Sequence, residues 1–501
     1  MSTQELPNWL KQRSFLTPNR IALSFGEEDY TFKDLWTKAI MMAEKLHTLL
    51  NSNHEPFVGL MIKNKVESVF VIHAIQQLGL TTVLLNHRLS PNELSYQIKD
   101  MNLRTIIYDD EFEDKLEGLS EEKKQLNKVS VSTLFNAPPS RFEIRDYFQL
   151  DQACSVMYTS GTTGAPKGVL QSYGNHWWSA IGSSLNLGIS ENDAWLCSVP
   201  LFHISGYSIV MRSVIYGMKV RLYESFDVNS INEELQSGSI TIMSVVSNML
   251  QRMTKSLGER SYHSNFRCML LGGGPAPLPL LETCKEKGIP VFQTYGMTET
   301  SSQIVTLSPE YSFSKLGSAG KPLFPSEIRI VSKSDKTLPY EEGEIVVKGP
   351  NVTKGYYKRE EANRKSFDEG WFYTGDIGYV DEEGFLFVLD RRSDLIISGG
   401  ENVYPAEIES VLLALDGVDD VGVVGISHDH WGQVPCAFIV RNDPPFLTEE
   451  TVINYCKEKL AAFKQPNKVI FVKEIPRNAS NKILRRVLRE QWEQGGFSHE
   501  D

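Results

Sequence analysis

The sequence predicts an α/β protein: a large N-terminal domain of parallel-sheet α/β layers with a small β-barrel-like portion, and a small α+β C-terminal domain. Up to about residue 322, short apolar runs alternate with amphipathic stretches of helical length. That alternation is typical of parallel sheets with crossover helices. Beyond residue 322, short strand-like runs are separated by Gly, Asp and Glu turns, which indicates antiparallel strands. The 501 residues suffice for roughly two to four domains.

The N-terminal part contains the clearest strand and helix patterns. Strands are expected at 58–62, 82–85, 105–108, 155–158, 240–246, 268–271 and 291–294, and helices at 67–78 and 91–101. Ser90 is a suitable N-cap for the helix at 91–101.

The C-terminal part is divided by a polar break. Before it, strands are expected at 328–331, 343–348 and 384–389. Residues 390–394, Asp-Arg-Arg-Ser-Asp, form the break. After it we expect helices at 405–415 and 449–463 and strands at 421–426 and 437–440. We therefore expect domains at 1–390 and 395–501.

Composition excludes several classes of protein. The chain has 51 Lys plus Arg, 63 Asp plus Glu and a net charge of -12. A chain this acidic is not expected to bind nucleic acid or anionic membranes in general, because contacts to phosphates need surplus positive charge. No apolar run approaches the roughly 18–20 residues of a membrane span. The six cysteines are scattered without a C-x-x-C pair, which argues against disulfides and zinc. A cytoplasmic enzyme is expected, and the oligomeric state, including a homo-oligomer, is left open.

A loop rich in Gly, Ser and Thr follows the strand at 155–158. Glycines let backbone N–H groups turn toward an anion, hydroxyls donate to phosphate oxygens, and lysine adds a charge. The alternative is a hydrophilic surface turn. The loop is not of the GxxxxGK[ST] kind, because Gly168 follows the lysine. The candidate phosphate-binding residues are Thr159, Ser160, Gly161, Thr162, Thr163, Gly164 and Lys167.

The segment 158–169 resembles the phosphate loop of the adenylate-forming superfamily, which includes acyl-CoA synthetases, luciferases and peptide-synthetase adenylation domains. Segments 295–299, 373–378, 391–402 and 476–484 match further motifs of that superfamily, in the same order. The resemblance implies an enzyme that uses ATP, Mg²⁺ and coenzyme A as a co-substrate. A carboxylate attacks the α-phosphate of ATP to give an acyl-adenylate, and a thiol then displaces AMP.

The resemblance also implies roles for individual residues. Glu299 would be the magnesium ligand and Thr298 a phosphate contact. Lys482 would bridge the substrate carboxylate and the α-phosphate, offsetting the repulsion between two anions. The usual S-G-K reads Ser-Asn-Lys here, and Asn481 tolerates a positive φ. The implied catalytic set is Lys482, Thr298, Glu299 and His203, and the implied nucleotide contacts are Gly272, Gly273, Gly274, Tyr295, Asp376 and Arg391.

The resemblance further implies that the C-terminal domain rotates between the two half-reactions. The pivot would lie in 390–394. The segment carrying Ser398, Gly399, Gly400 and Glu401 would then move toward coenzyme A. Read without the resemblance, these residues form only the glycine-rich start of the helix at 405–415.

The acyl pocket is expected to be polar. His203 lies in a segment that resembles the pocket lining of the superfamily, although a lone histidine is often a core residue. Segments 84–90, 293–309 and 315–322 most resemble the bacterial 2-succinylbenzoate–CoA ligases of menaquinone biosynthesis. Such a substrate keeps a second carboxylate, for which Arg88 or His203 are candidate partners. The predicted substrate contacts are Arg88, His203, Ser205, Ser302 and Gln303.

Three alternatives are consistent with the same motifs. The first is another aryl or medium-chain acyl-CoA ligase acting on benzoate, 4-coumarate or a fatty acid. The second is a peptide-synthetase adenylation domain. The third is a nucleotide-binding sensor without catalysis, which the presence of Lys167, Glu299, Asp376 and Lys482 argues against.

Overall fold

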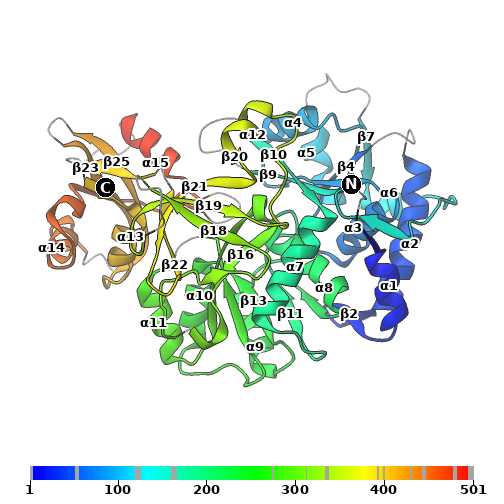
Figure 1. Cartoon of the computed structure of the whole chain (residues 1–501), viewed down its shortest axis with the longest axis horizontal. Coiled ribbons are helices and arrows are strands. Elements are labelled where there is room, and N and C mark those ends of the chain that lie inside the picture. Colours follow the sequence, from blue (N-terminus) through cyan, green and yellow to red (C-terminus); the bar gives the residue numbers. More distant parts are fainter. Residues whose placement is uncertain are drawn as a thin grey trace.

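The computed structural model consists of a large body and a smaller C-terminal unit at one end of its long axis (Figure 1). It describes residues 4–50, 56–117, 119, 126–159, 166–273, 276–311, 313–332, 338–391, 394–398, 401–428, 431–442, 447–477 and 482–494. Eight predicted site residues lie outside this description: Ser160, Gly161, Thr162, Thr163, Gly164, Gly274, Gly399 and Gly400. For Arg391 only the backbone is described.

The first sheet of the large body has six strands in the order β10-β9-β5-β4-β6-β7. Its parallel strands are β4 (Phe57–Met61), β5 (Thr81–Leu84), β6 (Thr105–Tyr108), β7 (Asn127–Ser130) and β9 (Ala153–Thr159). The antiparallel edge strand is β10 (Lys167–Ser172). Helix α4 (Pro91–Asp100) begins with the predicted Ser90 cap, whose side chain accepts a hydrogen bond from the Glu93 amide. The predicted parallel sheet is therefore confirmed.

The second sheet has nine strands in the order β17-β16-β15-β14-β13-β11-β12-β2-β3. Its six central strands are parallel: β2 (Ile21–Phe25), β11 (Ala194–Cys197), β12 (Lys219–Leu222), β13 (Ile242–Val245), β14 (Cys268–Leu271) and β15 (Val291–Met297). The edge strands β3 (Glu28–Thr31), β16 (Ser302–Thr306) and β17 (Lys321–Pro322) are antiparallel. The carboxyl ends of these parallel strands lie at one edge of the sheet. In α/β proteins, ligand-binding residues are commonly found at that edge.

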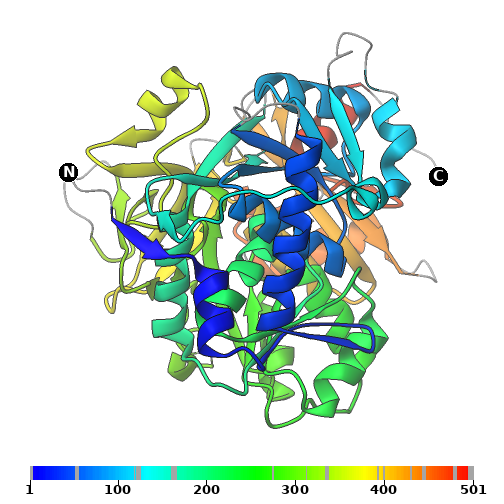
Figure 2. The same cartoon turned by 90° about the vertical axis from the view of Figure 1, so that its right-hand side faces the viewer.

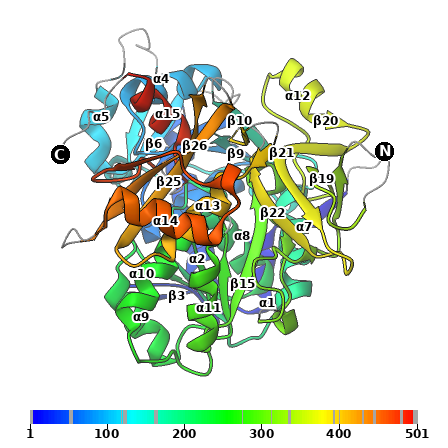
Figure 3. The same ribbon diagram turned by 90° about the vertical axis from the view of Figure 1, so that its left-hand side faces the viewer.

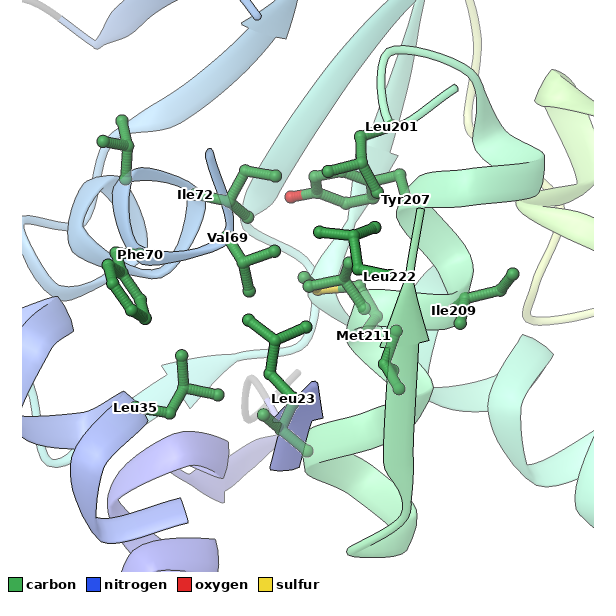
Figure 4. Close-up of a cluster of buried hydrophobic side chains, with 14 of the residues drawn as sticks. Leu23, Leu35, Val69, Phe70, Ile72, Leu201, Tyr207, Ile209, Met211 and Leu222 are labelled. Carbon is green, nitrogen blue, oxygen red and sulfur yellow. The ribbon is translucent and has the colours of Figure 1, made fainter. Parts of the chain in front are cut away.

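The main core lies between the two sheets. Helix α3 (Val66–Gln77) is buried at every position except Glu67, as expected of a helix enclosed between layers. Leu23, Val69 and Leu222 are among the side chains that converge there from β2, α3 and β12 (Figure 4). Helices α1 (Trp9–Leu16) and α2 (Phe32–Leu49) cover the end of the molecule opposite the C-terminal unit (Figure 2).

The remaining elements of the large body are mostly short. The helices are α5 (Glu113–Glu117), α6 (Val131–Asn136), α7 (Tyr173–Leu187), α8 (Ile204–Tyr216), α9 (Val228–Ser237), α10 (Ser247–Leu257), α11 (Leu278–Glu286) and α12 (Glu360–Ser366). Strands β1 (Glu5–Pro7) and β8 (Tyr147–Gln149) pair with each other. A third, antiparallel sheet contains β18 (Glu327–Val331), β19 (Gly343–Lys348), β20 (Phe367–Asp368), β21 (Trp371–Val380) and β22 (Leu386–Arg391), as predicted after residue 322.

The C-terminal unit has its own mixed sheet and its own apolar cores. Its strands are β23 (Ile396–Ser398), β24 (Glu401–Val403), β25 (Val418–His428), β26 (Gly432–Arg441) and β27 (Lys468–Phe471), and its helices are α13 (Pro405–Leu413), α14 (Glu449–Lys459) and α15 (Arg485–Glu493). The unit lies beside β22 and above α11 (Figure 3). The predicted polar break at 390–394 begins within the last two residues of β22 and ends before β23.

No described helix is both long and apolar enough to cross a membrane.

Candidate active site

The predicted phosphate loop connects two paired strands. Thr159 ends β9, Lys167 begins β10, and these two residues face each other across the antiparallel ladder. Residues 160–165 themselves lie outside the described part of the chain. The Lys167 ammonium lies 4.9 Å from the centre of the Tyr356 ring, a distance typical of a cation–π contact. Lys167 therefore lies at the stem of the predicted loop, and its role as a phosphate contact stays a prediction.

Both stems of this loop are attached to helix α4. The Tyr158 hydroxyl donates to the Asp100 carboxylate at 2.7 Å. The Tyr96 hydroxyl donates to the Pro166 carbonyl at 3.0 Å, and Arg359 bonds both Tyr96 and Asp100. Burial and then the Asp100 hydrogen bond raise the pKa of Tyr158, so its hydroxyl stays protonated and remains a donor. This brace holds the two ends of the loop at a fixed separation.

The segment after β15 carries Thr298 and Glu299 to the carboxyl edge of the second sheet. A β-bulge interrupts the ladder at Tyr295 and Gly296. A Cβ atom at Gly296 would lie 2.0 Å from the Ser302 carbonyl oxygen, so only glycine fits this turn. Ser302 has φ 102°, a strained value for a residue other than glycine. Such strain is often kept at functional sites, where neighbouring structure holds it in place.

The Glu299 carboxylate is buried and held by Tyr356. The Tyr356 hydroxyl donates to Glu299 Oε1 at 2.9 Å, while the face of the same ring receives Lys167. Tyr356 therefore contacts one residue from each of two predicted motifs. Tyr356 could not be predicted from the sequence, because a tyrosine in the turn-rich segment near residue 355 carries no chemical pattern of its own.

The described residues among the predicted nucleotide contacts lie close together. The Tyr295 hydroxyl donates to Asp376 Oδ2 at 2.7 Å, and both side chains are buried. Gly272 follows β14, the neighbour of β15, and Gly273 has φ +93°. Arg391 faces Asp376 across the β21–β22 ladder. The motifs that carry these residues therefore meet at one place in the large body.

The predicted acyl-pocket residues surround the start of α8. His203 precedes the helix, and its ring centre is 4.7 Å from that of Phe202. The Ser208 hydroxyl is 3.5 Å from the Ser302 hydroxyl, which joins α8 to the segment after Glu299. Gln303 is buried, and Ser205 is exposed. Arg88 is also exposed, with its guanidinium 5.9 Å from the centre of the Phe202 ring.

A buried arginine near this pocket was missed from the sequence. Arg212 lies one helical turn after Ser208 and is only 2% exposed. Its Nη2 is 3.4 Å from the Ser179 hydroxyl, and its guanidinium is 5.3 Å from the centre of the Trp195 ring. Its Nε has no hydrogen-bond partner, and no carboxylate of the described residues forms an ion pair with it. Burial lowers the pKa of Arg212, and the neighbouring Tyr216 partly offsets this effect.

The predicted lysine lies in the C-terminal unit. Lys482 is exposed and precedes Ile483, which forms a bridge with Arg477. Ser398 and Glu401 face each other in the β23–β24 hairpin. The roles given to these residues from the sequence stay predictions.

The surroundings of Glu299 fit a magnesium ion that is also bound by phosphate oxygens better than a metal ion bound only by protein side chains. Among the described residues, no group of three or more His, Cys, Asp or Glu side chains is placed to hold a metal ion. Magnesium is commonly held by one or two carboxylates together with phosphate oxygens. A single buried carboxylate beside a phosphate loop fits that arrangement.

Comparison with known protein families shows the family to which this chain belongs. The family model for AMP-binding enzymes matches residues 10–357, and the model for the AMP-binding enzyme C-terminal domain matches residues 407–482. The chain belongs to the AMP-binding enzyme family. The resemblance to adenylate-forming enzymes, drawn from the motifs, is thereby confirmed.

Curated relatives and solved structures refine this placement. A 2-succinylbenzoate–CoA ligase of a Geobacillus species is 55% identical over 97% of both chains, and one from Bacillus anthracis is 52% identical over 98% of this chain and 99% of the relative. The o-succinylbenzoate CoA synthetase of Bacillus subtilis with its acyl-adenylate intermediate is 49% identical, with a TM-score of 0.91 over 97% of this chain and 98% of that one. A double mutant of the same enzyme with a product analogue is 48% identical, with a TM-score of 0.76 over 98% of both chains.

Proposed function

We propose that this protein is an ATP-dependent acid–thiol ligase that forms 2-succinylbenzoyl-CoA, AMP and pyrophosphate from 2-succinylbenzoate, ATP and coenzyme A. This reaction would serve menaquinone biosynthesis. The observation that carries the proposal is the whole-length similarity to curated 2-succinylbenzoate–CoA ligases, at 55% identity. The gathering of Lys167, Glu299, Tyr295 and Asp376 at one edge of the sheets supports it.

In the first half-reaction, a carboxylate oxygen of the substrate attacks the α-phosphorus, and the bond from that phosphorus to pyrophosphate breaks. The reaction brings two anions together, so positioning and charge stabilisation supply most of the catalysis. Lys167 and Thr159 hold the phosphates, Glu299 and Thr298 face them, and Lys482 neutralises the reacting carboxylate and α-phosphate. Magnesium, when bound, supplies positive charge to the phosphate oxygens.

In the second half-reaction, the coenzyme A sulfur attacks the acyl carbon and AMP leaves. Lys482 belongs to a separate unit, and the thiol needs access to the same carbonyl. We place the hinge at 390–394, between an N-terminal domain of residues 1–390 and a C-terminal domain of residues 395–501. Rotation about this hinge would withdraw Lys482 and bring the segment from Ser398 to Glu401 toward the acceptor.

The second carboxylate of 2-succinylbenzoate needs a cationic partner. Arg212 is the strongest candidate, because its guanidinium is buried and no described carboxylate pairs with it. It lies on α8 one turn beyond Ser208, whose hydroxyl approaches Ser302. Arg88 and His203, which were predicted for this role from the sequence, remain alternatives nearer the surface.

A substrate panel tests the proposal. Pyrophosphate release and CoA-thioester formation are measured with 2-succinylbenzoate, benzoate, 4-coumarate and a medium-chain fatty acid. We expect kcat/KM to be highest for 2-succinylbenzoate, with both products formed in equal amounts. A higher kcat/KM for any monocarboxylate would overturn the substrate assignment, and release of pyrophosphate without thioester would overturn the ligase assignment.

A further inference from the structure

One carboxylate at the end of the large body contacts the C-terminal unit at two points. Asp390 lies in β22, opposite Ile377 of β21, and so belongs to the sheet of the large body. It is buried, although it is the first residue of the polar break. Its two oxygens have different partners, and both partners lie beyond the break.

The first partner is the N-terminus of helix α13. Asp390 Oδ2 accepts a hydrogen bond from the Ala406 amide at 3.0 Å. The N-cap residue of this helix, Tyr404, makes no side-chain cap hydrogen bond. The first amides of a helix need acceptors and favour negative charge. Asp390 therefore supplies from the large body a cap that the helix lacks in its own sequence.

The second partner is Arg485, the first residue of α15. Asp390 Oδ1 is 3.6 Å from Arg485 Nη1. The same guanidinium bonds both oxygens of Glu409, at 2.8 and 3.0 Å, and lies 3.3 Å from Asp394. Arg485 lies three residues after Lys482. The position of Arg485 therefore restrains the end of the segment that carries Lys482.

The four charged groups differ in how they would respond to domain rotation. Glu409 lies beyond the proposed hinge with Arg485 and would move with it, as would Asp394 at the C-terminal end of the hinge. Only Asp390 would stay behind. Arg485 would therefore keep two carboxylates in either arrangement, so that separation from Asp390 leaves no buried cation uncompensated.

The surrounding interface is open rather than closely packed. A cavity of about 700 Å³ separates β21 and β22 from α13 and the 3₁₀ turn Ala462–Lys464. Tyr404 bonds Glu342 across it, and the Leu278 amide lies 3.4 Å from the Ser410 hydroxyl. An interface built around such a cavity suits two sides that separate during function.

We propose that Asp390 is a latch: its carboxylate holds α13 and Arg485 against β22 and so positions Lys482 for the first half-reaction. Asp390 would act as a positioning residue, because the contacts described above are with Ala406 and Arg485 of the C-terminal unit. The inference rests on the proposed two-step reaction. It identifies Asp390 as the residue that favours the orientation of the C-terminal unit used in the first half-reaction.

The test measures the half-reactions separately in the full-length enzyme. ATP–pyrophosphate exchange with 2-succinylbenzoate reports the first, and single-turnover thioester formation from supplied acyl-adenylate and coenzyme A reports the second. We expect Asp390→Ala to slow exchange about tenfold or more, the effect of losing a charged hydrogen bond, without slowing thioester formation. Asp390→Asn keeps an acceptor for Ala406 but loses the charge, so it should give a smaller loss of exchange.

Glu409→Gln is the matched control, because it removes a carboxylate from the same arginine on the C-terminal side only. We expect it to change both half-reactions by a similar factor and to lower the melting temperature. The proposal is wrong if Asp390→Asn and Asp390→Ala slow both half-reactions by the same factor, or if they slow neither half-reaction. Failure of the wild-type enzyme in both assays would instead refute the proposed function. If Asp390→Ala does not fold, the ratio of the exchange rate to the thioester-formation rate in Asp390→Asn tests the proposal instead.

Discussion

The hydroxyl of Tyr356 and the carboxylate of Glu299 are 2.9 Å apart, and the same tyrosine ring lies 4.9 Å from the ammonium of Lys167. A cation of the phosphate loop and the candidate magnesium ligand thus share one buried neighbour. Tyr356 also pairs with Val169 of β10 through an isolated bridge, which fixes its backbone to the loop. The relative placement of the two motifs therefore depends on a residue that belongs to neither.

Tyr356→Phe should weaken this placement. Loss of a hydrogen bond to a charged group removes about 1.5–3 kcal/mol, so kcat/KM for ATP should fall roughly tenfold or more, and half-saturation should require more magnesium. Steady-state kinetics over a magnesium titration measure both effects. Tyr357→Phe is the control, since that ring packs against Phe57 instead of contacting Glu299. Equal effects of the two substitutions would contradict the role of Tyr356.

Lys482→Ala should reduce adenylation by about 10²–10³-fold, the scale for one preorganised charge-stabilising group. Thioester formation from a supplied acyl-adenylate should be spared, because the lysine acts only while the two anions react. Arg486→Ala removes an exposed cation of the same tail, paired with Glu490, and should affect neither step. Equal losses in both half-reactions of Lys482→Ala would refute its assignment.

Arg212→Gln should raise KM for 2-succinylbenzoate roughly 10–100-fold, because a buried charge-assisted contact to the second carboxylate is lost. KM for benzoate, which lacks that carboxylate, should change little. Arg88→Ala is assayed beside it with the same two acids. A selective effect of Arg88→Ala, with none for Arg212→Gln, would move the carboxylate site to the surface arginine.

Buried histidines should make the protein less stable in acid. Burial, and then the charge of Arg212, lowers the pKa of His176 from 6.5 to about 3. Between these values the unfolded chain binds a proton that the folded protein does not, so the free energy of unfolding falls as pH decreases. The slope from one such group is at most about 1.4 kcal/mol per pH unit.

His176→Asn should therefore flatten the pH dependence of stability between pH 6.5 and 4, even if it lowers stability at pH 7. Urea denaturation at several pH values, followed by tryptophan fluorescence, measures the slope. Parallel slopes for the wild type and the variant would show that His176 does not contribute.

The sequence by itself determined the fold class, several of the strands and helices, and the motifs that mark the family. Apolar runs with strand and helix periods predicted the parallel strands, and Ser90 predicted the start of α4, because these features depend on neighbouring residues in the chain. Lys167 was predicted because glycines and hydroxyls beside a lysine are typical of a phosphate loop. Tyr295, Glu299 and Asp376 came from the resemblance to the adenylate-forming superfamily, and their roles stay predictions.

Only the tertiary structure decided which distant residues serve that site. Tyr356 meets Glu299, Arg212 lies buried beside Ser179, and Asp390 caps a helix in the other unit. Each of these side chains is ordinary in its local sequence. Its significance comes from burial and from partners far away in the chain, and both are set by how the sheets and the C-terminal unit pack together.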